Sequence, residues 1–454
     1  MNLTQRPDGP PALEFAAFAA LDWGDEKHAW ALQTTEEANP TRATRRQGVL
    51  TNTPEAVEVW AAELRQRFAG RPIGLALEQV RGAVVAMLSK YAHIVLFPIH
   101  PKTLSNYRES LRPSGPKSDS SDATLLLEFL LRHFDQLKPL RPDTVGTRTL
   151  HILVEERRKF VNNHTALSNR LTGWFKQVFP QILVWFDDAG SPLVAKLLQR
   201  WPTLEALQKA KPETLRNFFH QHHCRSQVRI EERIAQIGIA VAATHDQALI
   251  QAGGLVIENL LKGVAQLRQT IAGLEQMIEK TFQEHPDYFI ASSFPGAGPA
   301  LAPRLIAALG TDRERFASAS DLQCHTGIAP VIVSSGKQHI VRWRWACPQF
   351  LRQTMHEWAL HSLQKSEWAR AYYNRQIANN KSHHAALRAL AFKWLRILYR
   401  CWTDRKPYDA ALYQSKLAIT APTQPLPSSR QIGRPFKIQW KNEGGLSKLA
   451  SFSS

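Results

Sequence analysis

The sequence predicts an α/β domain at the N-terminus followed by all-α regions. Two observations carry this fold class. The first quarter of the chain alternates short apolar runs of strand length with helical patterns, separated by turn residues. Residues 147–284 contain no convincing strand pattern and show apolar residues at helical spacing instead. A chain of 454 residues usually needs more than one hydrophobic core, so we expect two to four domains.

The N-terminal elements follow one another in a defined order. We expect strands at residues 14–24, 28–33, 45–50, 72–78 and 93–99, and helices at residues 53–68, 82–91 and 118–134. Thr53 is a suitable N-cap, and a basic loop is expected at residues 108–117. The order β-β-β-α-β-α-β-α combines an antiparallel hairpin with parallel crossovers, which is the arrangement of ribonuclease-H-like folds.

The rest of the chain reads as helical. Long amphipathic stretches are expected at residues 147–179 and 227–282, with shorter helices at residues 191–210 and 212–222. Partly heptad spacing in the second stretch indicates a helical hairpin or coiled coil. A Pro-Gly-x-Gly turn at residues 295–298 either brings backbone amides to a DNA phosphate or is a tight interhelical turn. We expect domains at residues 1–145, 146–288 and 289–415, and a flexible basic tail at residues 416–454.

The chain is strongly basic, with 57 Lys and Arg against 39 Asp and Glu, a net charge of +18 and a pI near 9.9. Such a charge attracts polyanions, although a basic protein without a nucleic-acid role remains the alternative. Residues 336–406 contain 14 Lys and Arg but three acids, interleaved with Trp and Tyr. This mixture suits phosphate contact and base stacking, or a helical core with a basic outer face. The candidate nucleic-acid contacts are Lys337, Arg342, Arg344 and Arg352.

Other compositional features exclude several classes of protein. The N-terminus lacks a secretory signal pattern, and no apolar run approaches the roughly 18 residues that span a bilayer. The four cysteines are scattered, so we expect a reduced, cytoplasmic protein without a disulfide framework. The HQHHC run at residues 220–224 lacks a second ligand pair, so no zinc site is expected.

Four acids fall where the expected fold would bring them together. Asp22 ends the first strand, and Glu78 ends the strand after the first helix. Asp119 and Asp122 are three residues apart at the start of a helix, so they share a face. Carboxylates this close repel one another, and two Mg²⁺ ions are the usual compensation in phosphoryl transfer. Taken singly, the acids are better explained structurally, Asp22 as a turn residue, Glu78 as a solvent-facing strand end, and Asp119 and Asp122 as helix-dipole partners.

Several motifs resemble those of the DEDD transposases of insertion sequences. These motifs are LDWGDEKHAWAL, LALEQVRGAV, KSDSSDA at residues 117–123, SFPGAGPALAPRLIAAL, and RFASASDLQCHTGIAPVIVSSGK, which ends at residue 337. That family consists of bridge-RNA-guided recombinases with a RuvC-like domain, a helical connector and a C-terminal transposase domain. The resemblance covers roughly residues 15–415 and is weak in the middle.

The resemblance implies a site and a set of partners. Asp22, Glu78, Asp119 and Asp122 would be the metal-binding quartet, for Mg²⁺ or alternatively Mn²⁺, and Ser335 would be the nucleophile. Ser334 precedes it and competes for the assignment. The partners would be donor and target DNA, a non-coding guide RNA, and further copies of the chain in a dimer or tetramer at the nucleoid of a bacterial or archaeal cell. The VRWRWACPQFLRQ segment departs from the small polar pair of many members, so its nucleic-acid contacts should differ.

Two other functions remain open at this point. The first is a RuvC-like, Mg²⁺-dependent junction-resolving nuclease in which water is the nucleophile and Ser335 is structural. The second is a non-catalytic RNA-binding scaffold with a decayed site, against which the presence of all four acids argues.

Overall fold

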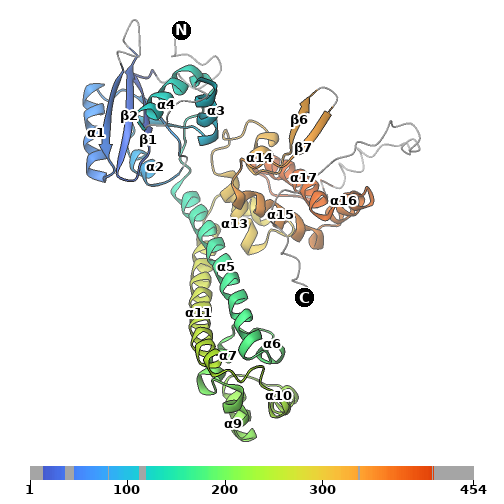
Figure 1. The fold of residues 1–454 in the computed structure, drawn as a ribbon. Helices are drawn as coiled ribbons and strands as arrows, with labels where there is room; N and C mark the ends of the chain where they lie inside the picture. The colour runs from blue at the N-terminus through green and yellow to red at the C-terminus, as the bar shows by residue number, and fades with distance from the viewer. Residues whose placement is uncertain are drawn as a thin grey trace, which may run out of the picture. The chain divides into compact units, whose positions relative to one another are not determined.

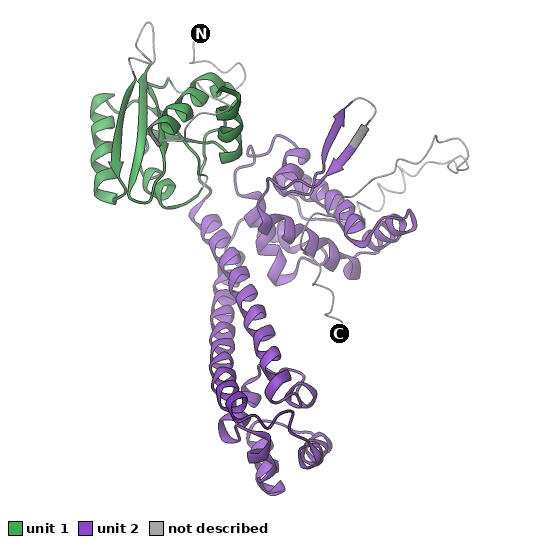
Figure 2. Cartoon of the chain, in the orientation of Figure 1, with its two compact units in different colours: residues 1–142 green, residues 143–454 purple. Residues whose placement is uncertain are grey.

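In the computed structural model the chain folds into two compact units, residues 1–142 and residues 143–454 (Figure 2). The structure describes residues 14–35, 45–79, 81–111, 119–335, 338–411 and 413. The expected tail at residues 416–454 and the candidate Lys337 lie outside the described residues. Each unit has hydrophobic clusters of its own.

The first unit confirms the expected order of strands and helices and adds one helix. Its strands are β1 (Ala17–Asp22), β2 (Lys27–Thr34), β3 (Arg46–Thr51), β4 (Ile73–Leu77) and β5 (Ile94–Pro98). Its helices are α1 (Pro54–Arg67), α2 (Ala83–Leu88), α3 (Pro101–Leu111) and α4 (Asp119–His133). A basic loop was predicted at residues 108–117, and this prediction is wrong for residues 108–111, which belong to α3. Pro101 suits a first helical position, and the buried Leu104 anchors α3 in the core.

The five strands form one mixed sheet in the order β3-β2-β1-β4-β5 (Figure 1). β1 and β3 are antiparallel to β2, whereas β1, β4 and β5 are mutually parallel. Side chains of α1 and α2 pack on one face, and those of α3 and α4 pack on the other. The sheet face under α4 is lined by alanines of β1, β2 and β4, whose small side chains leave room for the leucines of α4.

The second unit is helical apart from one hairpin. Its long helices are α5 (Val145–Val178) and α11 (Gln247–Gln283), which pack along each other (Figure 1). Between them in the chain come α6 (Ile182–Trp185), α7 (Pro192–Arg200), α8 (Leu204–Gln208), α9 (Pro212–Gln221) and α10 (Gln227–Ile239). The amphipathic stretch expected at residues 227–282 is therefore two helices. The break occurs because the Asp246 carboxylate caps α11 by accepting from the backbone amides of Ala248 and Leu249.

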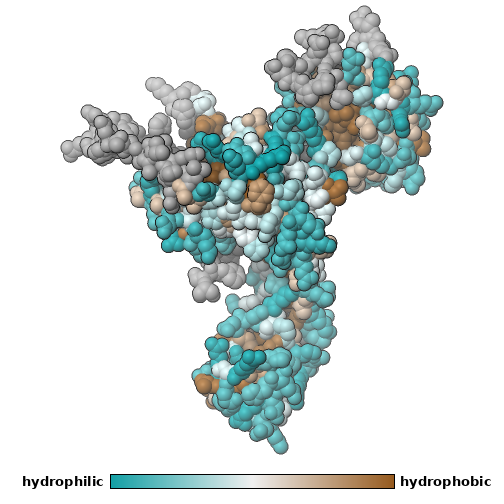
Figure 3. Space-filling view, turned by 180° about the vertical axis from the view of Figure 1, so that it is seen from behind, coloured by the Kyte–Doolittle hydropathy of each residue, from teal (hydrophilic) through white to brown (hydrophobic). Residues whose placement is uncertain are grey.

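One helix bears on the expectation that no segment of the chain spans a membrane. Of the helices that the structure describes, α11 is long and apolar enough to cross a bilayer by length and composition, which the sequence patterns had not indicated. The property is weak evidence, since core helices share it. Apolar residues of α11 join both clusters that α5 contributes to. We call the pair of long helices α5 and α11 the helical arm. In Figure 3 the displayed face of this helical arm is largely hydrophilic, as expected when apolar side chains turn toward a partner helix.

The C-terminal part of this unit packs around a tryptophan-rich core. Its elements are α12 (Tyr288–Ser292), α13 (Gly298–Leu309), α14 (Ala319–His325), β6 (Val331–Ser335), β7 (Gln338–Arg342), α15 (Gln349–Lys365), α16 (Glu367–Ala378) and α17 (His383–Thr403). Trp358, Trp394 and Trp402 are fully buried. Gly296 has a φ of 75°, and a Cβ there would lie 2.5 Å from the backbone nitrogen of Ser362. Close packing on α15 therefore explains this glycine as part of a tight interhelical turn.

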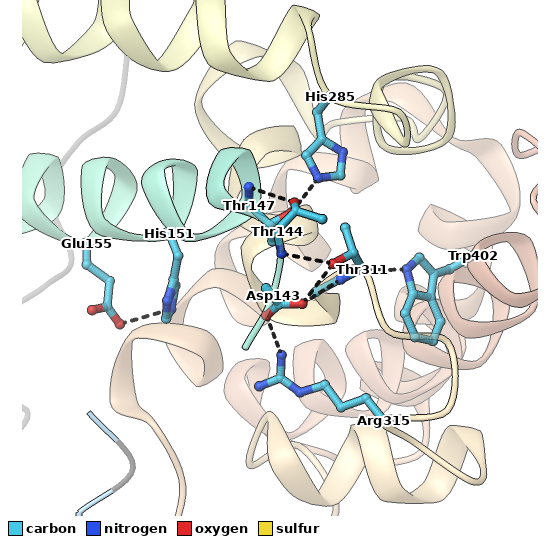
Figure 4. A network of polar contacts seen from close by, with 10 residues as sticks. Asp143, Thr144, Thr147, His151, Glu155, His285, Thr311, Arg315 and Trp402 are labelled. Atoms are coloured by element: carbon cyan, nitrogen blue, oxygen red, sulfur yellow. Dashed lines mark hydrogen bonds and ion pairs between the residues drawn. The ribbon is translucent and has the colours of Figure 1, made fainter. Parts of the chain in front are cut away.

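A polar network joins the start of α5 to the C-terminal helices (Figure 4). The Asp143 carboxylate accepts from the backbone amide of Thr311 at 2.8 Å, and its other oxygen lies 3.2 Å from Arg315. Thr144 caps α5, and Thr147 is hydrogen-bonded to the buried His285 at 2.8 Å. These bonds explain why the helical arm and the C-terminal helices belong to one compact unit.

Candidate active site

The carboxyl ends of β1 and β4 bring Asp22 and Glu78 to adjacent positions. The two strands are parallel, and their last paired residues are Leu21 and Leu77, each of which is followed by an acid. Strands in a sheet lie about 4.8 Å apart, so the two acids have neighbouring backbones. Leu21 points toward α1 and α2, so Asp22 lies on the opposite face, as does its cross-strand partner Ala29. The predicted placement of this pair at one sheet edge is confirmed.

Helix α4 runs antiparallel to β1 on that same face. Phe134, directly after the helix, has its ring 5.1 Å from the ring of Phe18 at the start of β1. Near the other end of the helix, Thr124 accepts a hydrogen bond from Gln47, which pairs in register with Ala31 and, through it, with Ala20. The first turn of α4 therefore lies toward the end of β1 that carries Asp22.

Asp122 in this first turn is buried, with 3% of its surface exposed. It lies one turn before Leu126, which packs on the sheet, so its side chain is on the inner side of the helix. Its Oδ1 is 2.8 Å from Nη2 of Arg108 in α3 but accepts no hydrogen bond of good geometry within the described residues. The guanidinium provides the positive charge that a buried carboxylate requires.

The chemistry of these acids fits a divalent ion. Asp22, Glu78 and Asp122 offer hard oxygen donors, and the poorly satisfied Oδ1 of Asp122 has capacity for a ligand. Asp119 begins α4, but its side chain lies outside the described residues. Within the described part of the chain, no three acidic, histidine or cysteine side chains gather closely enough to hold a metal. The quartet therefore remains a prediction.

Ser335 lies in an exposed hairpin of the second unit. It is the last residue of β6 and pairs with Gln338 of β7. Ser334 and Ser335 are both exposed, and strand alternation turns them to opposite faces of the hairpin. Across the described residues, neither hydroxyl is hydrogen-bonded to a histidine or a carboxylate. A serine hydroxyl is a weak nucleophile without such a partner, so any activation has to come from elsewhere.

The arginines expected to contact nucleic acid differ in their exposure and in their hydrogen bonds within the protein. Arg342 is exposed at the end of β7. Arg344 donates through Nε to the carbonyl of Ala329 at 3.2 Å, and Arg352 donates through Nη1 to the carbonyl of Arg344 at 3.2 Å. These two side chains therefore fix the segment after the hairpin as well as adding charge to it.

Arg108 was not recognised as a site residue from the sequence. The sequence placed it in a loop, where a basic side chain is unremarkable. The signal was the spacing of Leu104 and Arg108, four residues apart, which puts both on one helix face once α3 is recognised.

Comparison with known proteins identifies the family of this chain. Residues 19–180 match the model of DEDD transposases of the IS110 type, and residues 290–374 match that of the IS116/IS110/IS902 transposase family. The chain is 30% identical to a Streptomyces coelicolor protein named "mini-circle putative transposase for IS117", over 74% of this chain and 83% of the relative. It is 28% identical to an uncharacterized 42 kDa protein of insertion element IS900 from Mycobacterium paratuberculosis, over 72% and 81%. The chain belongs to the IS110 family of DEDD transposases and is a DNA-recombining enzyme.

Proposed function

We propose that this transposase cuts and rejoins DNA through a serine nucleophile assisted by divalent ions on a ribonuclease-H-like domain. The observation that carries the proposal is the placement of Asp22, Glu78 and the first turn of α4 at one end of the sheet. The mixed sheet order, with an antiparallel β1–β3 meander and parallel β4 and β5, supports the ribonuclease-H-like assignment.

The four acids would hold the ions, and the ions would supply Lewis-acid polarisation of the scissile phosphate. In this reading Asp22 and Glu78 contribute ligands from adjacent strand ends, while Asp119 and Asp122 contribute from the first turn of α4. Arg108 pairs with the buried Asp122 carboxylate at 2.8 Å and so balances its negative charge.

Ser335 would supply the nucleophile. Its Oγ forms a bond to phosphorus while the bond from phosphorus to the 3′ oxygen breaks, and the hydroxyl proton is exchanged for one on the departing 3′ oxygen. The product is a phosphoserine linked to the 5′ end and a free 3′-hydroxyl, whose later attack on a phosphoserine joins the exchanged strands. An exposed hairpin suits this role because a duplex backbone cannot enter a closed pocket.

The two sites lie in different compact units, so the reaction would require the hairpin of one unit to meet the acids of the other. Those acids could belong to the same chain or to another copy in a dimer or tetramer. Sequence choice would be delegated to a non-coding guide RNA, and the net charge of +18 supports binding of RNA and DNA backbones. Such an enzyme would act at the nucleoid in the cytoplasm.

The decisive experiment compares two adjacent serines. Ser335→Ala should abolish both the covalent DNA adduct, detected with end-labelled DNA on a denaturing gel, and strand exchange. Ser334→Ala, one residue away in the same strand, is the matched control and should retain both. If Ser335→Ala still cleaves DNA in Mg²⁺, water is the nucleophile and the junction-resolving nuclease is the better description.

Two further measurements address the remaining parts of the proposal. Asp119→Asn should eliminate DNA cleavage, and unchanged function of this variant would favour a non-catalytic scaffold. A defined RNA should copurify with the protein through stringent salt washes. Random cellular RNA in its place would remove the guide from the proposal and leave the recombinase.

A further inference from the structure

A cluster of tryptophans and arginines follows the serine-bearing hairpin. We call it the Trp345 platform; it comprises Trp343, Trp345, Arg352 and Arg388. Trp345 exposes 69% of its surface, which is unusual for the largest apolar side chain. The Arg352 guanidinium carbon lies 5.6 Å from the centre of the Trp345 ring and 5.4 Å from that of Trp343. Arg388 covers Trp343 at 3.7 Å.

The backbone beneath this platform is fixed by packing. Gly327 has a φ of 73°, and a Cβ there would lie 2.2 Å from Sγ of Cys347, so the segment is pressed against the end of α14. The Arg344 and Arg352 hydrogen bonds described above tie the same segment to α15 and to Ala329, two residues before β6 begins. The exposed indole is therefore held in place before any ligand arrives, which lowers the entropic cost of binding.

The charge around the platform is one-sided. His356 of α15 stacks on Trp343 with an interplanar angle of 13°. Burial is the largest cause that lowers the pKa of His356, and Arg388, His384 and Arg352 lower it further. Burial likewise lowers the pKa of Arg388, and repulsion from Arg352 adds to this effect. Positive charges held together on partly buried groups are stabilised by an incoming anion.

We propose that the Trp345 platform binds an unpaired nucleotide, with the base stacked on Trp345 and the adjoining phosphate held by Arg352 and the exposed Arg342. This assignment rests on the proposed nucleic-acid function and specifies its chemistry. Bases in a duplex are already stacked on one another and cannot reach an indole, whereas an unpaired base offers a free face. Trp343 and Trp345 come directly after β7, whose last residue Arg342 pairs with Val331, whereas Ser335 pairs with Gln338 at the turn end of the same hairpin. The platform would therefore hold a melted or single-stranded segment at one end of the hairpin, roughly 13 Å along the strands from the end that carries Ser335.

The test measures binding of short fluorescein-labelled oligo(dT), oligo(rU) and duplex DNA by anisotropy, using the full-length protein. Trp345→Ala should weaken binding of a single strand about tenfold, and Trp345→Phe should recover most of this loss because it restores an aromatic face. Duplex binding should change by less than about twofold. The matched control is Phe289→Ala, which removes another exposed aromatic ring (48% exposed) from α12 and should bind every probe like the wild type.

Two features separate stacking from misfolding and from simple charge effects. Trp345→Ala removes no charge, so the dependence of the dissociation constant on salt should keep its slope, whereas Arg342→Gln should reduce that slope by about one. The strand type that loses more affinity identifies the unpaired segment as RNA or DNA. Unchanged single-strand binding by Trp345→Ala, or equal losses for single strands and duplex, would overturn the proposal. If Trp345→Ala loses single-strand affinity while the wild-type protein forms no covalent serine adduct, the platform proposal stands and the serine nucleophile is rejected.

Discussion

Acidification should destabilise the C-terminal helices through His356, because its imidazole has a lower pKa in the folded protein than in the unfolded chain. Burial is the largest cause, and repulsion by Arg388, His384 and Arg352 adds to it; together they lower the pKa of His356 from 6.5 to about 4. Within the described residues its Nε2 is buried and has no hydrogen-bond partner. A proton on that nitrogen would therefore be both unsolvated and close to cations.

The sign and size of the effect follow from linkage. Above pH 6.5 the ring is neutral in both states and contributes no pH dependence. Below that value the unfolded chain binds one proton more than the native state, so the free energy of unfolding falls by about 1.4 kcal/mol per pH unit until the folded pKa is reached. Moving from about pH 7.5 to about pH 5 should thus cost about 2 kcal/mol, and the full loss near pH 4 is about 3 kcal/mol.

Hydrogen exchange of peptides from α15 and α17 is the suitable assay, since it reports local unfolding without requiring two-state behaviour of the whole chain. His356→Phe keeps a flat ring against Trp343 but cannot titrate, so its unfolding free energy should fall by about 2 kcal/mol less than that of the wild type over this pH range. His361→Phe, an exposed position on the same helix, is the matched control. Equal pH dependence of wild type and His356→Phe would refute the reasoning.

Two further predictions concern the packing beneath each site. Gly327→Ala should destabilise the segment after the hairpin by about 2 kcal/mol or more, because it combines a left-handed backbone with a Cβ 2.2 Å from Cys347. Cys347→Gly in the same chain should recover the steric part, and exchange rates in α14 would show it; no recovery would place the strain elsewhere. Arg108→Ala should destabilise the first unit by about 2–3 kcal/mol at neutral pH by leaving the Asp122 charge buried alone. Mn²⁺ should then raise the melting temperature of the Arg108→Ala variant more than that of the wild type. An equal or smaller rise would argue against metal binding at Asp122.

The sheet of the first unit was predictable because its signals are local. The run from Ile73 to Leu77 is buried throughout, as expected for a strand between two others with helices on both faces. Because parallel strands end at one edge, the adjacency of Asp22 and Glu78 followed from strand order alone. The Arg108–Asp122 ion pair did not, since it requires the existence of α3 and its rotation about its own axis. The spacing of Leu104 and Arg108 gives this rotation only once α3 itself has been recognised.

The hairpin β6–β7 was not predicted from the sequence, for a different reason. Its VIVSSGKQHIVR sequence contains two short β-branched runs with Gly-Lys between them, which is a hairpin signal. The prediction of a mostly helical unit does not include this hairpin, and the assignment of Ser335 rests on family resemblance and not on a strand pattern. β6 is also exposed on both of its faces, with Ile332 at 65% exposure, so the usual alternation of buried and exposed residues is lacking in this strand.

Net charge predicted the class of partner but not the place of binding, and the structure explains the difference. Arg304 donates to Thr354 and Glu357, and Arg313 pairs with Asp287, so part of the positive charge is already balanced inside the protein. Counterion release depends on cations that reach phosphate, so the salt dependence of binding should report far fewer contacts than the 57 Lys and Arg residues suggest. Base stacking is not reduced by this internal pairing, because an indole has no charge to neutralise. An exposed Trp345 is therefore a better guide to where an unpaired strand lies than the density of arginines around it.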